Sequence, residues 1–225
     1  MKIKTLLLAI ATMVALPSFA VKGVEDGSKF GTGEDSIRCL ENLSLYTNYY
    51  KIKDYNAAYD SWKIVFEECP TSAGTNLYSQ GAYILAYKLA GEKDQAKRQA
   101  LFEELMKCYD QRVKYYGTNK KYPESYIRGR QAMDYIKYSA DKDYLATVLP
   151  WLEQSVNGRG VEADNDVIQK YFELLEHRYQ SDKAKYSESF INQYLYLGDI
   201  VAQRIAKADK YKEAYIITRN NLNGI

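Results

Sequence analysis

The stretch LSLYTNYYKIKDYNAAYDSWKIVFEECP, residues 43–70, decides the fold of this chain. Apolar and aromatic side chains recur in it at three- and four-residue spacing, the period of an amphipathic helix. Asp54 interrupts the run once and is a good residue to cap a second helix. Pro70 ends that helix, because proline cannot continue one. The stretch therefore predicts an antiparallel pair of helices, over about 35–53 and 54–69.

Each predicted helix of this pair carries one apolar stripe, which should bury against its neighbour. In the first helix the stripe consists of Leu40, Leu43, Tyr46 and Tyr50, and in the second of Tyr55, Ala58, Trp62, Val65 and Phe66. We expect Trp62, the largest of these side chains, to be the main aromatic anchor of the pair.

The helical pattern continues beyond this pair to the end of the chain. Pro150 lies within one of the later helices and should kink or split it. Connections of two to six residues are typical of antiparallel neighbours, and no run alternates with period two. The sequence therefore predicts an all-α protein of helix pairs stacked in order. The later helices are expected near residues 73–90, 93–116, 123–139, 142–157, 163–180 and 183–207, with a last one from about 210.

The first 20 residues have the form of an export signal. Two lysines precede an apolar run over residues 5–16, and Ser18 and Ala20 occupy the small-residue positions of a cleavage site. The run is shorter than the roughly 20 residues of a membrane-spanning helix. Residues 21–34 contain four glycines and are expected to be a flexible leader, followed by a helical repeat domain over 35–225. We expect a periplasmic or extracellular protein without membrane insertion after signal removal.

Charge and motif content argue against several function classes. The 31 basic and 29 acidic residues become equal in number once the export signal is removed, whereas nucleic-acid surfaces show a basic excess. No phosphate-binding glycine loop or zinc pattern occurs. The single histidine, His177, follows Glu173 by one turn and is interpreted as a solvated residue paired with it. Glu162, Asp164 and Asp166 lack the glycine and glutamate of a calcium loop and are interpreted as helix caps. No metal, cofactor or nucleic-acid partner is expected, and no enzymatic activity.

The three cysteines would enter an oxidising compartment on export. Cys39 lies 14 residues before the turn at Lys53 and Cys69 lies 16 residues after it, so the two are nearly level in an antiparallel pair. We predict a Cys39–Cys69 disulfide, worth about 3 to 4 kcal/mol in the chain-entropy model; two buried free thiols are the alternative. Cys108 is expected to be a lone buried thiol, with an intermolecular bridge as the alternative.

Residues 43–70 resemble a tetratricopeptide repeat, a motif of two helices that stacks into a right-handed superhelix. Tyr46 departs from the repeat, which has Gly or Ala there, so a widened or tilted helix pair is expected. Residues 197–221 resemble the repeat more weakly, and the pairs between are divergent. The repeat-like pairs thus lie near 36–70 and 195–225. The matching packing positions are Leu45, Tyr49, Tyr55, Ala58, Trp62 and Pro70 in the first stretch and Ala202, Tyr211 and Ala214 in the second.

The whole chain also resembles a group of exported tetratricopeptide-like proteins of the Bacteroidota, a resemblance that implies no assigned activity. It rests on DGSKFGTGEDSIRCLENLSLY (26–46), CYDQRVKYYG (108–117) and YPESYIRGRQAMDYIKY (122–138). The triplet Asp35-Ser36-Ile37 fits the O-glycosylation pattern of that phylum, and a helix cap explains it equally well. Because the sequence stops within the last repeat-like pair, either its end is frayed or it is a fragment of a longer protein.

Tyrosine, with 23 residues, provides the remaining functional evidence. Most of these rings should fill helix interfaces, with their hydroxyls reaching water. A subset lining the concave side of the stack would form an aromatic, hydrogen-bonding groove. The candidates for this subset are Tyr78, Tyr83, Tyr87, Tyr126, Tyr135 and Tyr138.

The leading functional hypothesis is a non-catalytic scaffold of the cell envelope that binds a protein or peptide partner. The alternative is a glycan-binding module of a nutrient-uptake system that uses tyrosines as stacking platforms, and a more distant one is a helical cell-wall hydrolase with an unidentified glutamate. Mixed charge with scattered tyrosines would favour a peptide, coplanar exposed rings a sugar, and a buried glutamate of raised pKa hydrolysis.

Overall fold

The computed structural model describes residues 30, 32–69 and 74–224. All regular elements in these residues are helical, which confirms the predicted all-α class. The predicted export signal, most of the predicted leader and Pro70 lie outside the described residues. The helices are α1 (Gly33–Lys51), α2 (Tyr55–Glu68), α3 (Thr75–Gly91), α4 (Gln95–Tyr116), α5 (Glu124–Tyr138), α6 (Leu145–Arg159), the 3₁₀ helix η2 (Gly160–Glu162), α7 (Asn165–Ser181), α8 (Lys183–Ala206) and α9 (Lys212–Leu222).

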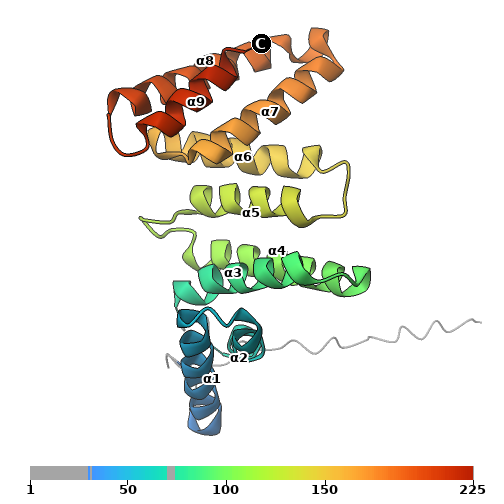
Figure 1. The fold of residues 1–225 in the computed structure, drawn as a ribbon, viewed down its shortest axis with the longest axis vertical. Coiled ribbons are helices and arrows are strands. Elements are labelled where there is room, and N and C mark those ends of the chain that lie inside the picture. The colour runs from blue at the N-terminus through green and yellow to red at the C-terminus, as the bar shows by residue number, and fades with distance from the viewer. Residues whose placement is uncertain (1–29, 31, 70–73, 225) are drawn as a thin grey trace, which may run out of the picture.

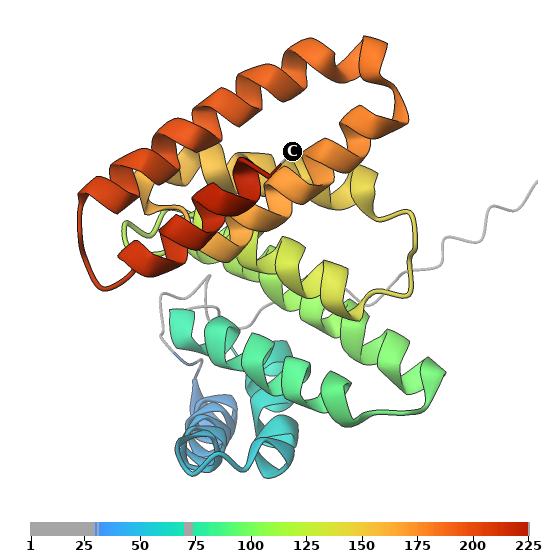
Figure 2. The same cartoon turned by 45° about the horizontal axis from the view of Figure 1, so that its top comes forward.

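The α-helices follow one another along the longest axis of the molecule (Figure 1). Each one contacts the next in sequence, and α9 folds back beside both α7 and α8 (Figures 1 and 2). The result is an elongated stack of antiparallel neighbours rather than a bundle around a single axis. No helix in the described part of the chain is long and apolar enough to cross a membrane.

Capping aspartates begin three of the helices. The side chains of Asp54, Asp94 and Asp182 each accept a backbone N–H from the residue three positions later, at 2.9 to 3.0 Å. Such bonds satisfy a helix N-terminus that would otherwise lack partners. Asp54 also follows Lys53, whose φ of 64° makes the tight turn between α1 and α2.

The start of α1 differs from the prediction. The helix begins at Gly33 with Thr32 at its N-cap, so Asp35 and Ser36 lie in the first turn and do not cap it. The sequence also predicted that Pro150 would kink or split its helix, and the split does not occur. Pro150 lies inside α6, which is one continuous helix.

The first helix pair has a fully buried tryptophan at its centre. Trp62 stacks on Phe66 with ring centroids 4.9 Å apart, and its indole N–H donates to the carbonyl oxygen of Leu77 in α3. Ala58 is fully buried as well, and Tyr49 and Tyr55 pack against the same core while remaining partly exposed. The expected role of Trp62 as the aromatic anchor therefore agrees with its position.

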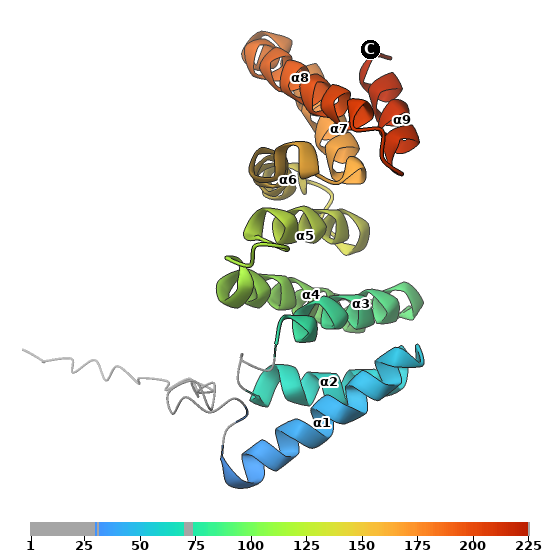
Figure 3. The ribbon, with the colours of Figure 1, turned by 90° about the vertical axis from the view of Figure 1, so that its left-hand side faces the viewer.

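One of the packing positions assigned to α1 is wrong. Leu45 was expected to pack, yet 46% of its surface is exposed, whereas its neighbour Tyr46 is 1% exposed. Cys39 and Tyr46 are two turns apart and share the buried face, so Leu45 and also Leu40 point away from it. A tyrosine ring thus occupies the interface where the repeat has a small residue, and α1 runs obliquely across α2 (Figure 3).

The weaker repeat match in α8 and α9 also assigns exposed residues to the core. Ala202 is exposed, because the buried face of α8 consists of Leu197, Ile200, Val201 and Arg204. Tyr211 is 51% exposed, Ala214 is half-buried, and the ring that enters the core is Tyr215. Ala202 and Tyr211 are therefore not core packing residues.

Candidate functional site

A groove of about 650 Å³ lies between α3, α4 and α5, and we refer to it as the tyrosine groove. One face of α3 forms its first wall with small side chains at helical spacing, among them Ser79, Ala82 and Ala86. Tyr109 and Arg112 of α4 contribute from the second helix, and α5 forms the opposite wall. The space exists because the small residues of α3 do not fill the gap to the larger side chains facing them.

Four of the six tyrosines selected from the sequence line this groove: Tyr83, Tyr87, Tyr126 and Tyr138. Two tyrosines that sequence reasoning did not select, Tyr109 and Tyr122, line it as well. Rings from three separate helices and from the loop before α5 therefore converge on one surface.

The other two selected tyrosines do not belong to the groove. Tyr78 is 2% exposed and packs in the core against Phe66, Tyr115 and Tyr116. It follows Leu77 on the buried side of α3, whereas the groove side carries Ser79, Ala82 and Tyr83.

Tyr135 lies on the other side of α5 from the groove. Its ring packs between Phe102 of α4, at 5.2 Å, and Trp151 of α6, at 5.7 Å. Tyr78 is thus a core residue and Tyr135 a partly buried interface residue, and neither lines the groove.

The rings at one end of the groove belong to a larger cluster. Tyr83 and Tyr87 contact Tyr55 of α2, and Tyr50 of α1 contacts both Tyr55 and Tyr83, with centroids 4.9 to 6.0 Å apart. The planes of these pairs are inclined by 57° to 80°. Tilted contacts of this kind are favoured between aromatic rings, and they leave no flat platform of coplanar rings.

Asp134 is the one carboxylate of the groove lining in the described residues. It accepts a 2.7 Å hydrogen bond from the Tyr109 hydroxyl. Burial raises the pKa of the Asp134 carboxyl, and the hydrogen bond from Tyr109 and the charges of Lys137 and Arg130 oppose that rise. Burial also raises the pKa of Tyr109 well above its ordinary value, so this hydroxyl remains a donor.

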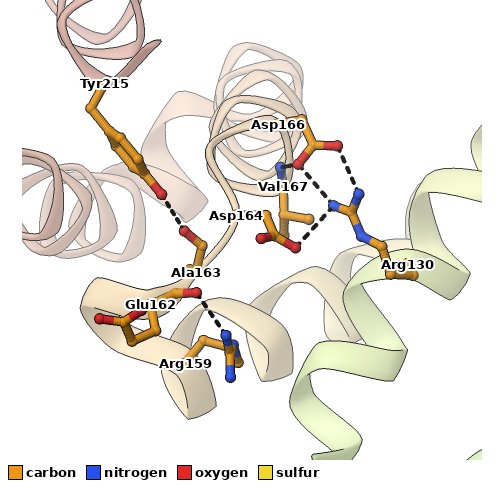
Figure 4. Close-up of polar contacts among 8 residues, drawn as sticks. All are labelled: Arg130, Arg159, Glu162, Ala163, Asp164, Asp166, Val167 and Tyr215. Carbon is orange, nitrogen blue, oxygen red and sulfur yellow. Dashed lines mark hydrogen bonds and ion pairs between the residues drawn. The ribbon is translucent and has the colours of Figure 1, made fainter. Parts of the chain in front are cut away.

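Arg130 at the groove is already paired with acidic side chains. Its guanidinium donates to both carboxylate oxygens of Asp166, at 2.8 and 3.0 Å, and lies 3.6 Å from Asp164 (Figure 4). Asp166 also accepts the N–H of Val167 at the start of α7. This network fixes α5 to the first turn of α7 and neutralises the charge of Arg130.

The acids interpreted from the sequence as helix caps are ion-pair partners instead. Asp164 occupies the N-cap of α7 but makes no capping bond with its side chain. Glu162 lies 2.8 Å from the ammonium of Lys207 and 3.7 Å from Arg204. Nearby, the Tyr215 hydroxyl donates to the carbonyl oxygen of Ala163 (Figure 4), so this junction connects α5, α7, α8 and α9 structurally.

The pairing suggested for His177 is also different in the structure. His177 is exposed on α7, and Glu173 receives a 2.6 Å hydrogen bond from Lys170, on its other side along the helix. In the described residues no group of three or more His, Cys, Asp or Glu side chains is arranged to hold a metal ion.

Cys39 and Cys69 form a disulfide, with their Cα atoms 5.7 Å apart. The bond joins the second turn of α1 to the residue after α2, as the antiparallel pair predicts. Cys108 is a free buried thiol that donates to the carbonyl oxygen of Tyr78. Burial raises the pKa of Cys108, which disfavours the reactive thiolate.

Sequence reasoning missed Tyr109, Tyr122 and the charged side chains of the groove. One available indication was the spacing of Tyr126, Arg130, Asp134 and Tyr138, which places four non-aliphatic residues on one face of α5.

No protein-family model matches this chain, and no curated protein or solved structure is significantly similar to it. Function is therefore inferred from the groove itself.

Proposed function

We propose that this protein is a non-catalytic scaffold of the cell envelope that binds a peptide segment of a partner protein in the tyrosine groove. The observation that carries the proposal is the convergence of six tyrosines and four charged side chains on one open groove. We further propose that the helix pairs form a right-handed, tetratricopeptide-like superhelix. Stacked helical repeats bind partners on such extended concave surfaces.

The lining of the groove suits a peptide. Tyrosine presents a large apolar surface and a hydroxyl on a side chain with few rotatable bonds, so it contacts varied residues at a low entropic penalty. Charged groups at the same surface can orient and select the bound chain. A volume of about 650 Å³ also lies within the range of about 300 to 1,000 Å³ typical of ligand sites.

The glycan alternative has less support from the arrangement of the rings. Tyr122 and Tyr126, the adjacent pair at the α5 wall, are inclined by 46°, and the cluster around Tyr55 is more strongly tilted. The hydrolase alternative has less support at this groove, whose described lining contains one carboxyl group, that of Asp134, whereas glycoside hydrolysis ordinarily uses a pair.

Peptide selection from a random octapeptide phage library tests the proposal, with the chain from residue 21 as the immobilised target. We expect enriched peptides whose binding is lost in the double variant Tyr83→Ala/Tyr87→Ala, because both rings are exposed at the groove. Tyr211→Ala is the matched control, since Tyr211 is similarly exposed but lies outside the groove. Failure to enrich any peptide, or equal binding to the groove variant, would contradict the proposal.

A further inference from the structure

Two arginines of the described chain are buried to the same degree but differ in their partners. Arg112 and Arg204 are each 6% exposed. Arg204 lies 3.3 Å from Asp209 and 3.7 Å from Glu162. Arg112 has no ion pair and no hydrogen bond with any described residue. Its Nε–H is buried without a partner, as is the Nε–H of Arg204. Among the residues that the structure describes, Arg112 is therefore a buried cation without a counter-ion.

The position of Arg112 directs it towards the groove. It lines the tyrosine groove from α4, and its guanidinium lies 5.8 Å from the ring of Tyr122 and 5.9 Å from the ring of Tyr126. Both rings also line the groove. Cation–π contacts hold the guanidinium in place, but they leave its N–H donors free for an acceptor in the plane of the group.

The other charged groups of the groove do not compensate Arg112. Arg130 is bound to Asp166, and the exposed Lys137 lies beside the ring of Tyr138. Asp134 accepts a hydrogen bond from the hydroxyl of Tyr109 and forms no ion pair with Arg112. Because burial of an unpaired charge is unfavourable, an anionic group entering the groove would gain its strongest contact at Arg112.

We propose that Arg112 binds the carboxylate of an aspartate or glutamate side chain, so that the tyrosine groove selects acidic peptide segments. This inference rests on the proposed peptide-binding function and adds the chemistry of its ligand. A guanidinium matches a carboxylate with two parallel hydrogen bonds. One uncompensated cation requires one negative charge, and a phosphate dianion would place a second charge in a groove that already contains Asp134.

The experiment uses an enriched octapeptide from the library, synthesised with acetyl and amide ends so that no terminal carboxylate remains. Each Asp or Glu is replaced by Asn or Gln in turn, and Kd is measured by fluorescence anisotropy. We expect the enriched peptides to contain acidic residues, and one replacement to weaken binding to the native chain by about tenfold or more. In Arg112→Gln the same replacement should have no effect.

Two further variants keep the test informative. Arg219→Gln removes the same charge from an exposed position of α9 and should preserve the acidic preference. Arg112→Lys keeps the charge and loses the paired donors, so we expect an intermediate Kd; it also replaces Arg112→Gln if that variant does not fold. Circular dichroism checks that each variant is folded.

The outcomes separate this inference from the proposal on which it depends. Peptides that bind the groove equally well with Glu or Gln would overturn the role of Arg112 and leave peptide binding intact. If no peptide is enriched, peptide binding itself is wrong. Binding of oligogalacturonate that depends on Arg112, without peptide binding, would overturn the acidic peptide as ligand, because the carboxylate would then belong to a sugar.

Discussion

The indole N–H of Trp62 donates a 2.9 Å hydrogen bond to the carbonyl oxygen of Leu77, and this bond joins the first helix pair to the second. Both residues are almost completely buried. Leu77 lies in the first turn of α3, the helix that later provides one wall of the tyrosine groove. The geometry of the groove therefore depends on a core contact made well outside it.

Trp62→Ala should strongly destabilise the protein, because it removes a fully buried ring and leaves the Leu77 carbonyl without its donor. We expect a loss of about 3 to 5 kcal/mol in the free energy of unfolding, measured by urea denaturation. Ile52→Ala serves as the control, since this apolar side chain is exposed and should change stability by at most about 0.5 kcal/mol. An unchanged urea midpoint for Trp62→Ala would show that the ring is not the anchor.

Two glycine-to-alanine substitutions should change the free energy of unfolding in opposite directions. A Cβ atom at Gly81 would overlap the indole ring of Trp62, whereas a Cβ atom at Gly198 of α8 would meet nothing. Gly81→Ala should lower the free energy of unfolding by about 1 to 3 kcal/mol through overpacking. Gly198→Ala should raise it by about 0.5 to 1 kcal/mol, because alanine is the better helix former. Thermal melts of both variants check the signs, and equal effects would be inconsistent with the packing of α3 on Trp62.

The sequence pattern predicted the helices well, but matching to the repeat was less successful at predicting which side chains are buried. Periodicity and capping residues located the first pair because these signals are local to the chain. Matching to the repeat selected Leu45 and Ala202, each one residue away from the buried Tyr46 and Val201. A shift of one residue turns a helical side chain by about 100°, so a motif match without a partner helix cannot establish the face.

The groove itself could not be predicted from the sequence, because it is formed by three helices whose packing is a tertiary property. In the sequence, Arg112 is a charge within RVKYY and is indistinguishable from a solvated helix residue. Its burial becomes apparent only when Tyr122 and Tyr126 lie against it. Likewise, Tyr78 and Tyr83 are both α3 tyrosines, and only the position of α4 and α5 separates a core ring from a groove ring.

Two of the cysteines should be held in a disulfide bond, and the third should be an unreactive thiol in the native protein. With the Cys39–Cys69 bond formed, one thiol remains per chain, and burial raises the pKa of Cys108. We expect no reaction with an aromatic disulfide reagent in the native protein and one reactive thiol in denaturant. Cys39→Ser/Cys69→Ser should lose about 3 to 4 kcal/mol of stability in the chain-entropy model. A second reactive thiol in denatured, non-reduced protein would show that the bond does not form.

Asp134 should make stability depend on pH. Burial raises its folded-state pKa above the unfolded value of about 3.9. The contribution of the Asp134 carboxyl to the free energy of unfolding is therefore fully present below about pH 4. It decreases as pH rises through the folded-state pKa. Asp134→Asn keeps an acceptor for Tyr109 and removes the charge, so its melting temperature should exceed that of the native chain at pH 7 by more than at pH 4. The same difference at both pH values would exclude a raised pKa.

The contrast between the two buried arginines predicts opposite effects on stability when each is replaced by methionine. Arg204→Met removes the partner of Asp209 and leaves Glu162 paired with Lys207 alone, and because both acids are partly exposed we expect a loss of about 1 to 2 kcal/mol. Arg112→Met removes a buried charge that has no counter-ion in the described part of the chain and substitutes an apolar chain of similar length, so the free energy of unfolding should stay the same or rise by about 1 kcal/mol. Urea denaturation of the two variants at low and high salt measures the difference. If Arg112→Met were destabilised as much as Arg204→Met, Arg112 would be serving the fold, and the groove would not contain an unpaired cation reserved for a ligand.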